Sequence, residues 1–186
     1  MLLYNFRVRS SAVEHCLDTA GVTGSIPVAP TKYLYFKLLK FCNLIYLKIM
    51  FKCFIVAVFL ASIIFLIIDV IWLSFATKSF YRPLLGDLLS DKPVFWAAGL
   101  FYILYMFGMA VIVIQPCIEP SGLSKSLYNG FIFGLVAYGT YNLTNMAVIK
   151  DWSPTVVFVD MFWGASLTAL SATTGIYLAK KIVHFS

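Results

Sequence analysis

The fold is decided by one apolar stretch, CFIVAVFLASIIFLIIDVIWLSFA, which occupies residues 53–76 and contains a single charged residue, Asp69. A helix that crosses a bilayer needs about 20 mainly apolar residues. Three later stretches also meet this requirement: residues 94–114 and 127–149 carry no charge, and residues 155–179 carry only Asp160. The sequence therefore predicts an all-α integral membrane protein built as a bundle of four transmembrane helices.

The composition agrees with this fold class. The 186 residues are 61% hydrophobic and only 12% charged, whereas a soluble domain is about 45–50% apolar and about 25% charged. These values exclude a water-soluble enzyme and a soluble nucleic-acid-binding protein, and the lipid bilayer is the expected partner. The net charge of +6 does not favour nucleic acid either, because six of the 14 basic residues lie in residues 1–49, outside the apolar body.

The first 49 residues differ from the rest of the chain. Residues 9–31 show neither the helical nor the strand period of apolar residues. The run Gly24-Ser25-Ile26-Pro27 resembles the translation of the T-arm of a transfer-RNA gene. We expect translation to begin at Met50, which leaves residues 50–186 as the membrane domain. The alternative is a disordered N-terminal arm followed by a basic, aromatic stretch, residues 33–49, on the membrane surface.

Polar side chains of all four predicted helices fall in one layer. Each helical residue adds about 1.5 Å along the helix axis. By this rise, five polar residues lie roughly 6–12 Å from the same membrane boundary: Asp69, Asp160, Asn142, Asn145 and Tyr102. Tyr141 and Thr144 each directly precede one of the two asparagines. We interpret these seven residues as an ion-binding or structural polar layer.

Small residues predict where the helices pack. Gly164, Thr168 and Gly175 share the helical stripe of Asp160, and Gly130-x-x-x-Gly134 forms a second close-packing motif. Such faces point inward in membrane bundles, so Asp160 is expected inside the bundle. Trp72 and Trp163 each follow an aspartate by three residues, and we interpret both as interfacial belt residues.

The connection between the first two predicted spans has helical spacing of its own. Within residues 81–92, apolar and aromatic side chains recur at that spacing, namely Tyr81, Leu84, Leu85, Leu88 and Leu89. Pro83 suits a first helical turn. This pattern predicts a short amphipathic helix that lies on the interface and covers the polar layer.

Several motifs together resemble one known family. They are Asp69-Val-Ile-Trp72-Leu73, Phe80-Tyr81, Phe101-Tyr102-Ile-Leu-Tyr105, Tyr138-Gly-Thr-Tyr141-Asn142-Leu-Thr144-Asn145 and Asp160-Met-Phe-Trp163-Gly164. In this order they resemble DUF2177, a family of small four-helix bacterial membrane proteins, over about residues 50–186. The resemblance implies a fold and a bacterial membrane location but no activity. It also implies that residues 1–49 have no counterpart in the family.

The residues limit the chemistry that the bundle can perform. The two histidines, His15 and His184, lie outside the predicted spans, and the four cysteines form no CxxC pair. We therefore expect no cofactor, no metal site and no catalytic residues. Our interpretation is a structural or partner-binding membrane component. The alternatives are a proton- or cation-coupled transporter that uses Asp69 and Asp160, working as a homodimer, and a membrane-embedded hydrolase.

Orientation follows from the distribution of positive charge. An even number of spans puts both termini of residues 50–186 on one side. Counted from Met50, each side has four Lys or Arg residues, and Lys37, Lys40 and Lys48 add three to the side of the termini if they are translated. The positive-inside rule then predicts a bacterial cytoplasmic membrane protein with both termini in the cytoplasm.

Overall fold

The structure is a computed structural model that describes residues 32–90, 92–119 and 121–183, and these residues form helices and no strands. The chain divides into two units, Met1–Phe51 and Lys52–Ser186. The predicted all-α class is confirmed for the described part of the chain. The transfer-RNA-like run at residues 24–27 and both histidines lie outside the described residues.

The helical elements follow the predicted order, and their bounds are as follows. The first is α2 (Lys32–Ala76), which leads into the π-helical turn η1 (Thr77–Tyr81), the short α3 (Arg82–Leu85) and the 3-10 turn η2 (Gly86–Leu88). The second is α4 (Phe95–Gly108), continued by the π-helical η3 (Met109–Ile114) and the 3-10 turn η4 (Gln115–Cys117). The last two are α5 (Leu123–Val148) and α6 (Pro154–Val183).

Three helical stretches within the described residues are long and apolar enough to cross a membrane: Leu39–Leu88, Phe95–Cys117 and Pro154–Val183. α5 is not among them, although residues 127–149 form one of the predicted spans. The reason lies in its sequence, which mixes glycines with the polar side chains of Ser124, Lys125, Ser126, Asn129, Thr140, Asn142, Thr144 and Asn145. The membrane class of the prediction therefore stands with three candidate spans.

The connection after α2 is more continuous than the sequence predicts. Where residues 81–92 predict one amphipathic helix, the structure has η1, α3 and η2 in direct succession. Gly86 ends α3 with φ at 51°, a left-handed conformation that glycine adopts without strain. Tyr81 consequently lies in the wide turn η1 and not at the start of a separate helix.

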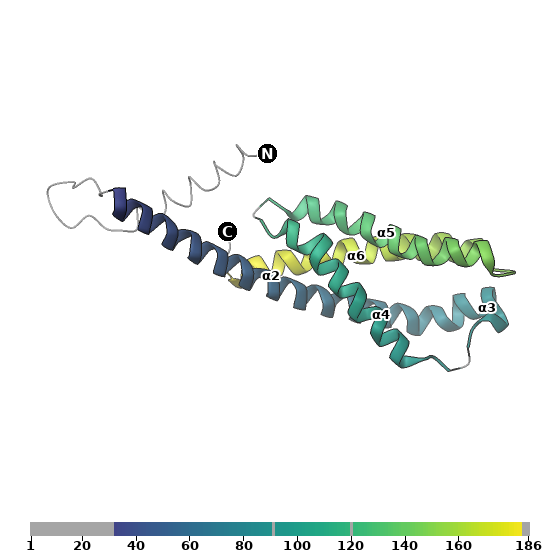
Figure 1. The fold of residues 1–186 in the computed structure, drawn as a ribbon. Helices are drawn as coiled ribbons and strands as arrows, with labels where there is room; N and C mark the ends of the chain where they lie inside the picture. Colours follow the sequence, from purple (N-terminus) through teal and green to yellow (C-terminus); the bar gives the residue numbers. More distant parts are fainter. Residues whose placement is uncertain (1–31, 91, 120, 184–186) are drawn as a thin grey trace. The chain divides into compact units, whose positions relative to one another are not determined.

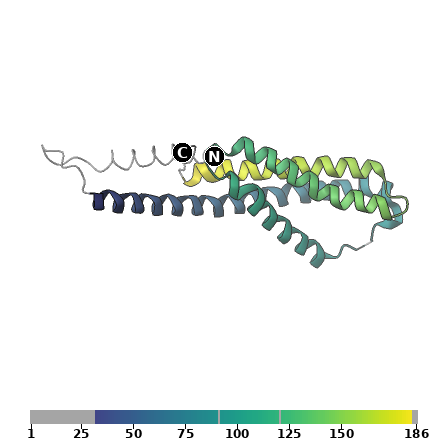
Figure 2. The same ribbon diagram turned by 45° about the horizontal axis from the view of Figure 1, so that its top comes forward.

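α6 is the central helix of the unit Lys52–Ser186. Thirteen of its residues are buried, and Figures 1 and 2 show α5 and α6 lying side by side. A Cβ atom added at Gly130 would lie 2.8 Å from Ala169 Cα, and one added at Gly134 would overlap the Gly164 carbonyl oxygen. On another face of α6, a Cβ at Gly175 would lie 2.8 Å from the Ala57 carbonyl oxygen of α2. These close approaches place four of the predicted packing residues, Gly130, Gly134, Gly164 and Gly175, at helix contacts.

The apolar core lies beside the polar layer. Phe65, Tyr105 and Leu167 form a buried cluster from α2, α4 and α6. Cys53 and Cys117 are also buried. Large apolar side chains cover the outside of the bundle: Phe59, Phe95 and Phe158 are 65%, 79% and 73% exposed. A surface of this kind is suited to contact with lipid.

Candidate functional site

The two aspartates of the predicted polar layer are both inside the bundle. Asp69 of α2 is 4% exposed and Asp160 of α6 is 7% exposed. A charged side chain within a bilayer costs about 2.5–3.5 kcal/mol on insertion scales and marks a functional site by default. Their burial therefore makes their hydrogen-bond partners the first question.

Asp69 accepts two hydrogen bonds from two other helices. The Tyr102 hydroxyl of α4 donates to Oδ2 at 2.7 Å, and the Trp163 indole Nε1 of α6 donates to Oδ1 at 3.3 Å. The carboxylate thus joins α2 to α4 and α6. Each of its oxygens accepts only one of these bonds, so acceptor capacity remains.

Asp160 is held in the same way by different donors. The Tyr81 hydroxyl donates to Oδ1 at 2.5 Å, and Asn142 Nδ2 donates to Oδ2 at 3.4 Å. Asn142 also donates to the Tyr138 carbonyl oxygen at 3.2 Å, whereas its own Oδ1 is buried without a hydrogen-bond partner. This second carboxylate therefore joins α6 to α5 and η1.

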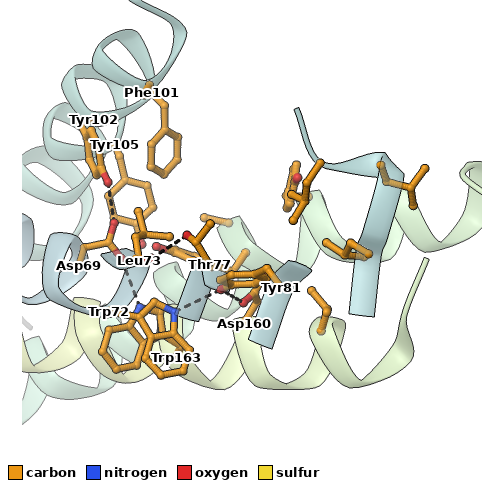
Figure 3. Close-up of a pocket in the computed structure, with 18 of the residues that line it drawn as sticks. Asp69, Trp72, Leu73, Thr77, Tyr81, Phe101, Tyr102, Tyr105, Asp160 and Trp163 are labelled. Carbon is orange, nitrogen blue, oxygen red and sulfur yellow. Dashed lines mark hydrogen bonds between the residues drawn. The ribbon is translucent and has the colours of Figure 1, made fainter. Parts of the chain in front are cut away.

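The segments Asp69–Trp72 of α2 and Asp160–Trp163 of α6 are connected to each other by hydrogen bonds and ring stacking. Trp163 donates directly to Asp69, and Trp72 Nε1 donates at 3.2 Å to the Tyr81 hydroxyl, which in turn donates to Asp160. The two indole rings stack with their centroids 4.4 Å apart and an interplanar angle of 20°. Figure 3 shows the stacked rings with the two aspartates on different sides of them. Each tryptophan is thus tied to the aspartate of the other segment.

A cavity of about 500 Å³ lies between these groups. This volume falls in the usual range of small-molecule sites, about 300–1,000 Å³. Aromatic side chains make up much of its wall: Trp72, Tyr81, Phe101, Tyr102, Tyr105, Tyr138, Tyr141, Trp152 and Trp163. Aliphatic side chains, Leu73, Leu85, Leu88, Leu89 and Val156 among them, complete most of the remainder.

The described residues of the cavity wall carry acidic groups but no basic groups. Asp69 and Asp160 are the acidic residues of the wall, and among the described residues around the cavity none is Lys, Arg or His. A buried carboxylate is normally paired with a positive group or binds a proton. The wall therefore offers negative charge and hydrogen-bond acceptors in an aromatic surround, and its described residues include no basic side chain.

The structure brings some of the predicted polar-layer residues together and leaves others apart. Asp69, Asp160, Asn142 and Tyr102 share the hydrogen bonds described above. Tyr141 lines the cavity but is 58% exposed, and it packs edge-on against Trp152 with centroids 5.9 Å apart. The Thr144 hydroxyl donates to its own helix, to the Thr140 carbonyl oxygen, and neither Thr144 nor Asn145 lines the cavity. The part that any of these residues plays in function stays a prediction.

The structure also locates the predicted packing residue Thr168 and the two tryptophans that were assigned to the interfacial belt. Thr168 is fully buried on α6, where its hydroxyl is 2.6 Å from the Tyr105 hydroxyl. Trp72 and Trp163 are half-buried and stacked on each other within the bundle. Their predicted place in the interfacial belt stays a prediction.

Sequence reasoning did not assign Tyr81 to the site. Tyr81 follows Asp69 by 12 positions and lies beyond the predicted end of the first span at Ala76. The π-helical geometry of η1 turns its hydroxyl toward Asp160. Such turns occur frequently at functional sites, but the apolar pattern of the sequence carries no sign of one. The available signals were the Phe80-Tyr81 pair in the family resemblance and the amphipathic spacing of residues 81–92, which predicts a helix that covers the polar layer.

The arrangement is suited to binding a molecule in the cavity. Among the described residues no group of three or more His, Cys, Asp or Glu side chains could hold a metal ion. Each aspartate is held through both of its oxygens by donors from other elements. The cavity can therefore supply acceptors, aromatic faces and negative charge to a molecule that enters it.

Comparison with known proteins gives one match. A family described as "Predicted membrane protein (DUF2177)" matches residues 54–177, a stretch that includes both aspartates and all the residues of the cavity wall. No curated protein and no solved structure matches the chain.

Proposed function

Because the chain belongs to the DUF2177 family of predicted membrane proteins, we propose that it is a multi-pass membrane protein whose cavity binds a small organic cation. Asp69 and Asp160 act as the counter-ions of this cation. Trp72, Trp163 and the neighbouring tyrosines contribute aromatic faces. This proposal develops the cation-coupled alternative that the sequence leaves open.

The observation that carries the proposal is the unbalanced charge of the cavity. Two buried carboxylates face a space of about 500 Å³, and the described residues that line it include no basic side chain. Cations bind over aromatic faces within about 6 Å of the ring centroid, with about 2 kcal/mol or more when the site is desolvated. An organic cation satisfies both features, because it supplies the positive charge and fits an aromatic wall.

The proposal includes the finer topology. α5 would form the fourth span, because its 26 residues are long enough at about 1.5 Å each and it packs closely against α6. η1, α3 and η2 would lie at the interface and cover the cavity. Both termini would be cytoplasmic in a bacterial inner membrane, and a homodimer would form the working unit. The site would bind and pass on its ligand without a catalytic step.

A structural role is the competing proposal, and one observation favours it. Each aspartate accepts two hydrogen bonds that join its helix to other elements. Carboxylates used in this way would lock helix pairing and need no ligand. The two proposals differ in what a conservative Asp→Asn change does to cation binding.

Binding of butyltrimethylammonium to the purified full chain in maltoside detergent tests the proposal. We expect Asp69→Asn and Asp160→Asn each to weaken binding at least tenfold, because each removes one negative charge from the wall. Asp87→Asn is the matched control, since Asp87 is an exposed carboxylate in η2 that does not line the cavity. No binding by the wild type, or equal binding by all four proteins, would favour the structural role.

A further inference from the structure

We propose that the cation is the head of a single-chain amphiphile that enters from the bilayer, with its alkyl chain in the apolar mouth of the cavity, and that phosphate-bearing lipids are rejected. This inference rests on the proposed cation site and names its ligand class. It follows from the unequal exposure of the residues that line the cavity, the surface around its mouth and the charge of its wall.

The cavity wall combines buried acidic residues with exposed residues that are mostly apolar, Thr77 and Tyr141 being the exposed ones with a hydroxyl. Asp69, Asp160 and Tyr105 of its wall are 4%, 7% and 5% exposed. Leu73 of α2, Leu88 of η2 and Phe101 of α4 line the same cavity but are 39%, 48% and 45% exposed. We call these three residues the mouth. A ligand that fills the cavity along its length would therefore place a polar group inside and an apolar group outside.

The surface beside the mouth is suited to lipid and not to water. On α4, Phe95, Leu100 and Leu104 are 79%, 59% and 68% exposed, and on α2, Ile71 and Phe75 are 65% and 70% exposed. Figure 2 shows the beginning of α4, the helix that carries Phe101, inclined away from α5 and α6. An alkyl chain that leaves the mouth along these side chains would stay among apolar groups.

The stick view shows how polar groups of the wall lie. In Figure 3, Phe101 lies apart from the stacked Trp72 and Trp163, and the hydroxyls of Tyr102 and Tyr81 point toward the two aspartates to which they donate. These hydroxyls are thus engaged by the aspartates, and the side chains of the three mouth residues are hydrocarbon.

Charge decides which amphiphiles fit. A phosphate group beside two carboxylates would meet like charge, and the described residues of the wall supply no Lys, Arg or His to offset it. Lys78 and Arg82 lie in or next to η1, but both are exposed and neither lines the cavity. An ammonium head without phosphate meets two carboxylates and the aromatic faces of the wall. The chemical class is therefore a long-chain amine or quaternary ammonium compound.

Four probes separate this inference from the proposed site. Butyltrimethylammonium and dodecyltrimethylammonium differ only in chain length, while dodecylphosphocholine has the longer chain with a phosphate in the head. Binding is measured with the full chain in maltoside micelles, and dodecylmaltoside itself reports chain binding without charge. The variant with both Asp69→Asn and Asp160→Asn corrects for partition of each probe into the micelles.

The inference predicts a specific pattern. After correction, the dodecyl ammonium binds at least tenfold more tightly than the butyl compound, and dodecylphosphocholine does not compete. Phe101→Ala weakens dodecyl binding at least fivefold and changes butyl binding less than twofold. Phe107→Ala is the matched control, because Phe107 is 68% exposed on the same helix but does not line the cavity.

Different contrary results would overturn the amphiphile inference alone or the proposed cation site as well. Equal binding of the butyl and dodecyl compounds, or competition by dodecylphosphocholine, would overturn the amphiphile inference and leave the cation site intact. Equal effects of Phe101→Ala and Phe107→Ala on dodecyl binding would also overturn the assigned mouth. If no ammonium probe binds the wild type better than the double aspartate variant, the proposed function itself fails, and this inference fails with it.

Discussion

The contact between α5 and α6 should be sensitive to a single methyl group at Gly134. A Cβ there would lie 2.7 Å from Thr168 Oγ1 and 2.8 Å from Ala165 Cα, and it would overlap the Gly164 carbonyl oxygen. Two of these three atoms belong to backbone, so the clash cannot be relieved by turning a side chain. The helices themselves have to move apart.

The size of the effect follows from two opposing contributions. Overpacking of a filled interior costs about 1–3 kcal/mol, and contact with backbone places Gly134→Ala near the upper value. Replacing a helical glycine by alanine returns up to about 1 kcal/mol through helix propensity. We therefore expect Gly134→Ala to lower the free energy of unfolding by about 2 kcal/mol, the difference between these two contributions.

Gly99→Ala is the matched control for this prediction. Gly99 is exposed within α4, and a Cβ added there meets no atom within 4 Å. The same chemical change should stabilise the protein by up to about 1 kcal/mol at this position. Unfolding by sodium dodecyl sulfate in mixed micelles, followed by circular dichroism, measures both variants.

The displacement should also reach the cavity. Thr168 is 2.6 Å from the Tyr105 hydroxyl, so pushing Thr168 away disturbs a residue of the cavity wall. Gly134→Ala should thus weaken cation binding, and Gly99→Ala should not. The packing argument is refuted if Gly134→Ala is as stable as the wild type or shifts stability in the same direction as Gly99→Ala.

Two further predictions concern Asp160 and the tryptophan stack. Asp160→Leu removes the acceptor of the Tyr81 hydroxyl and one of the two acceptors of Asn142 Nδ2, and it should cost about 2 kcal/mol in the same unfolding assay. Asp160→Asn keeps one acceptor oxygen and should cost less than about 1 kcal/mol, and equal losses would speak against these hydrogen bonds. Trp163→Phe removes one of the two donors to Asp69 and reduces the stacked area, so butyltrimethylammonium binding should weaken about fivefold. The adjacent, exposed Phe162→Leu serves as control, and an equal effect of both would contradict the assignment.

The sequence predicts the helical class and the membrane location well, because both depend on long runs of apolar residues. The run at residues 53–76 continues farther than the sequence indicates, since the wide turn η1 and the short α3 prolong it without a polar break. α5 shows the limit of the same reasoning. Its glycines and amides serve its contact with α6, and they lower its hydropathy below that of the three candidate spans.

The polar layer could be located from the sequence, but its connections could not. Counting the rise per residue places Asp69, Asp160 and Asn142 at similar depths. It does not give the rotation of one helix relative to another, so it cannot determine which donor meets which aspartate, such as Trp163 with Asp69. Tyr81 was missed for a related reason, because a π-helical turn changes the direction of every side chain that follows it.

The cavity itself has no signature in the sequence. Its wall combines residues from α2, η1, α3, η2, α4, α5 and α6, and only packing determines that Leu73, Phe101 and Val156 face one space. The absence of basic residues from the described part of that wall is likewise a consequence of packing. Lys78 and Arg82 are close to Tyr81 in the chain, yet neither lines the cavity.

The central claim is that the two buried aspartates together hold one organic cation in each chain. Equilibrium dialysis of radiolabelled butyltrimethylammonium against the purified full chain in maltoside measures this directly. The account predicts one saturable site per chain in the wild type and none in the variant with both Asp69→Asn and Asp160→Asn. The same saturable binding in the double variant, or no saturable binding in the wild type, would contradict it.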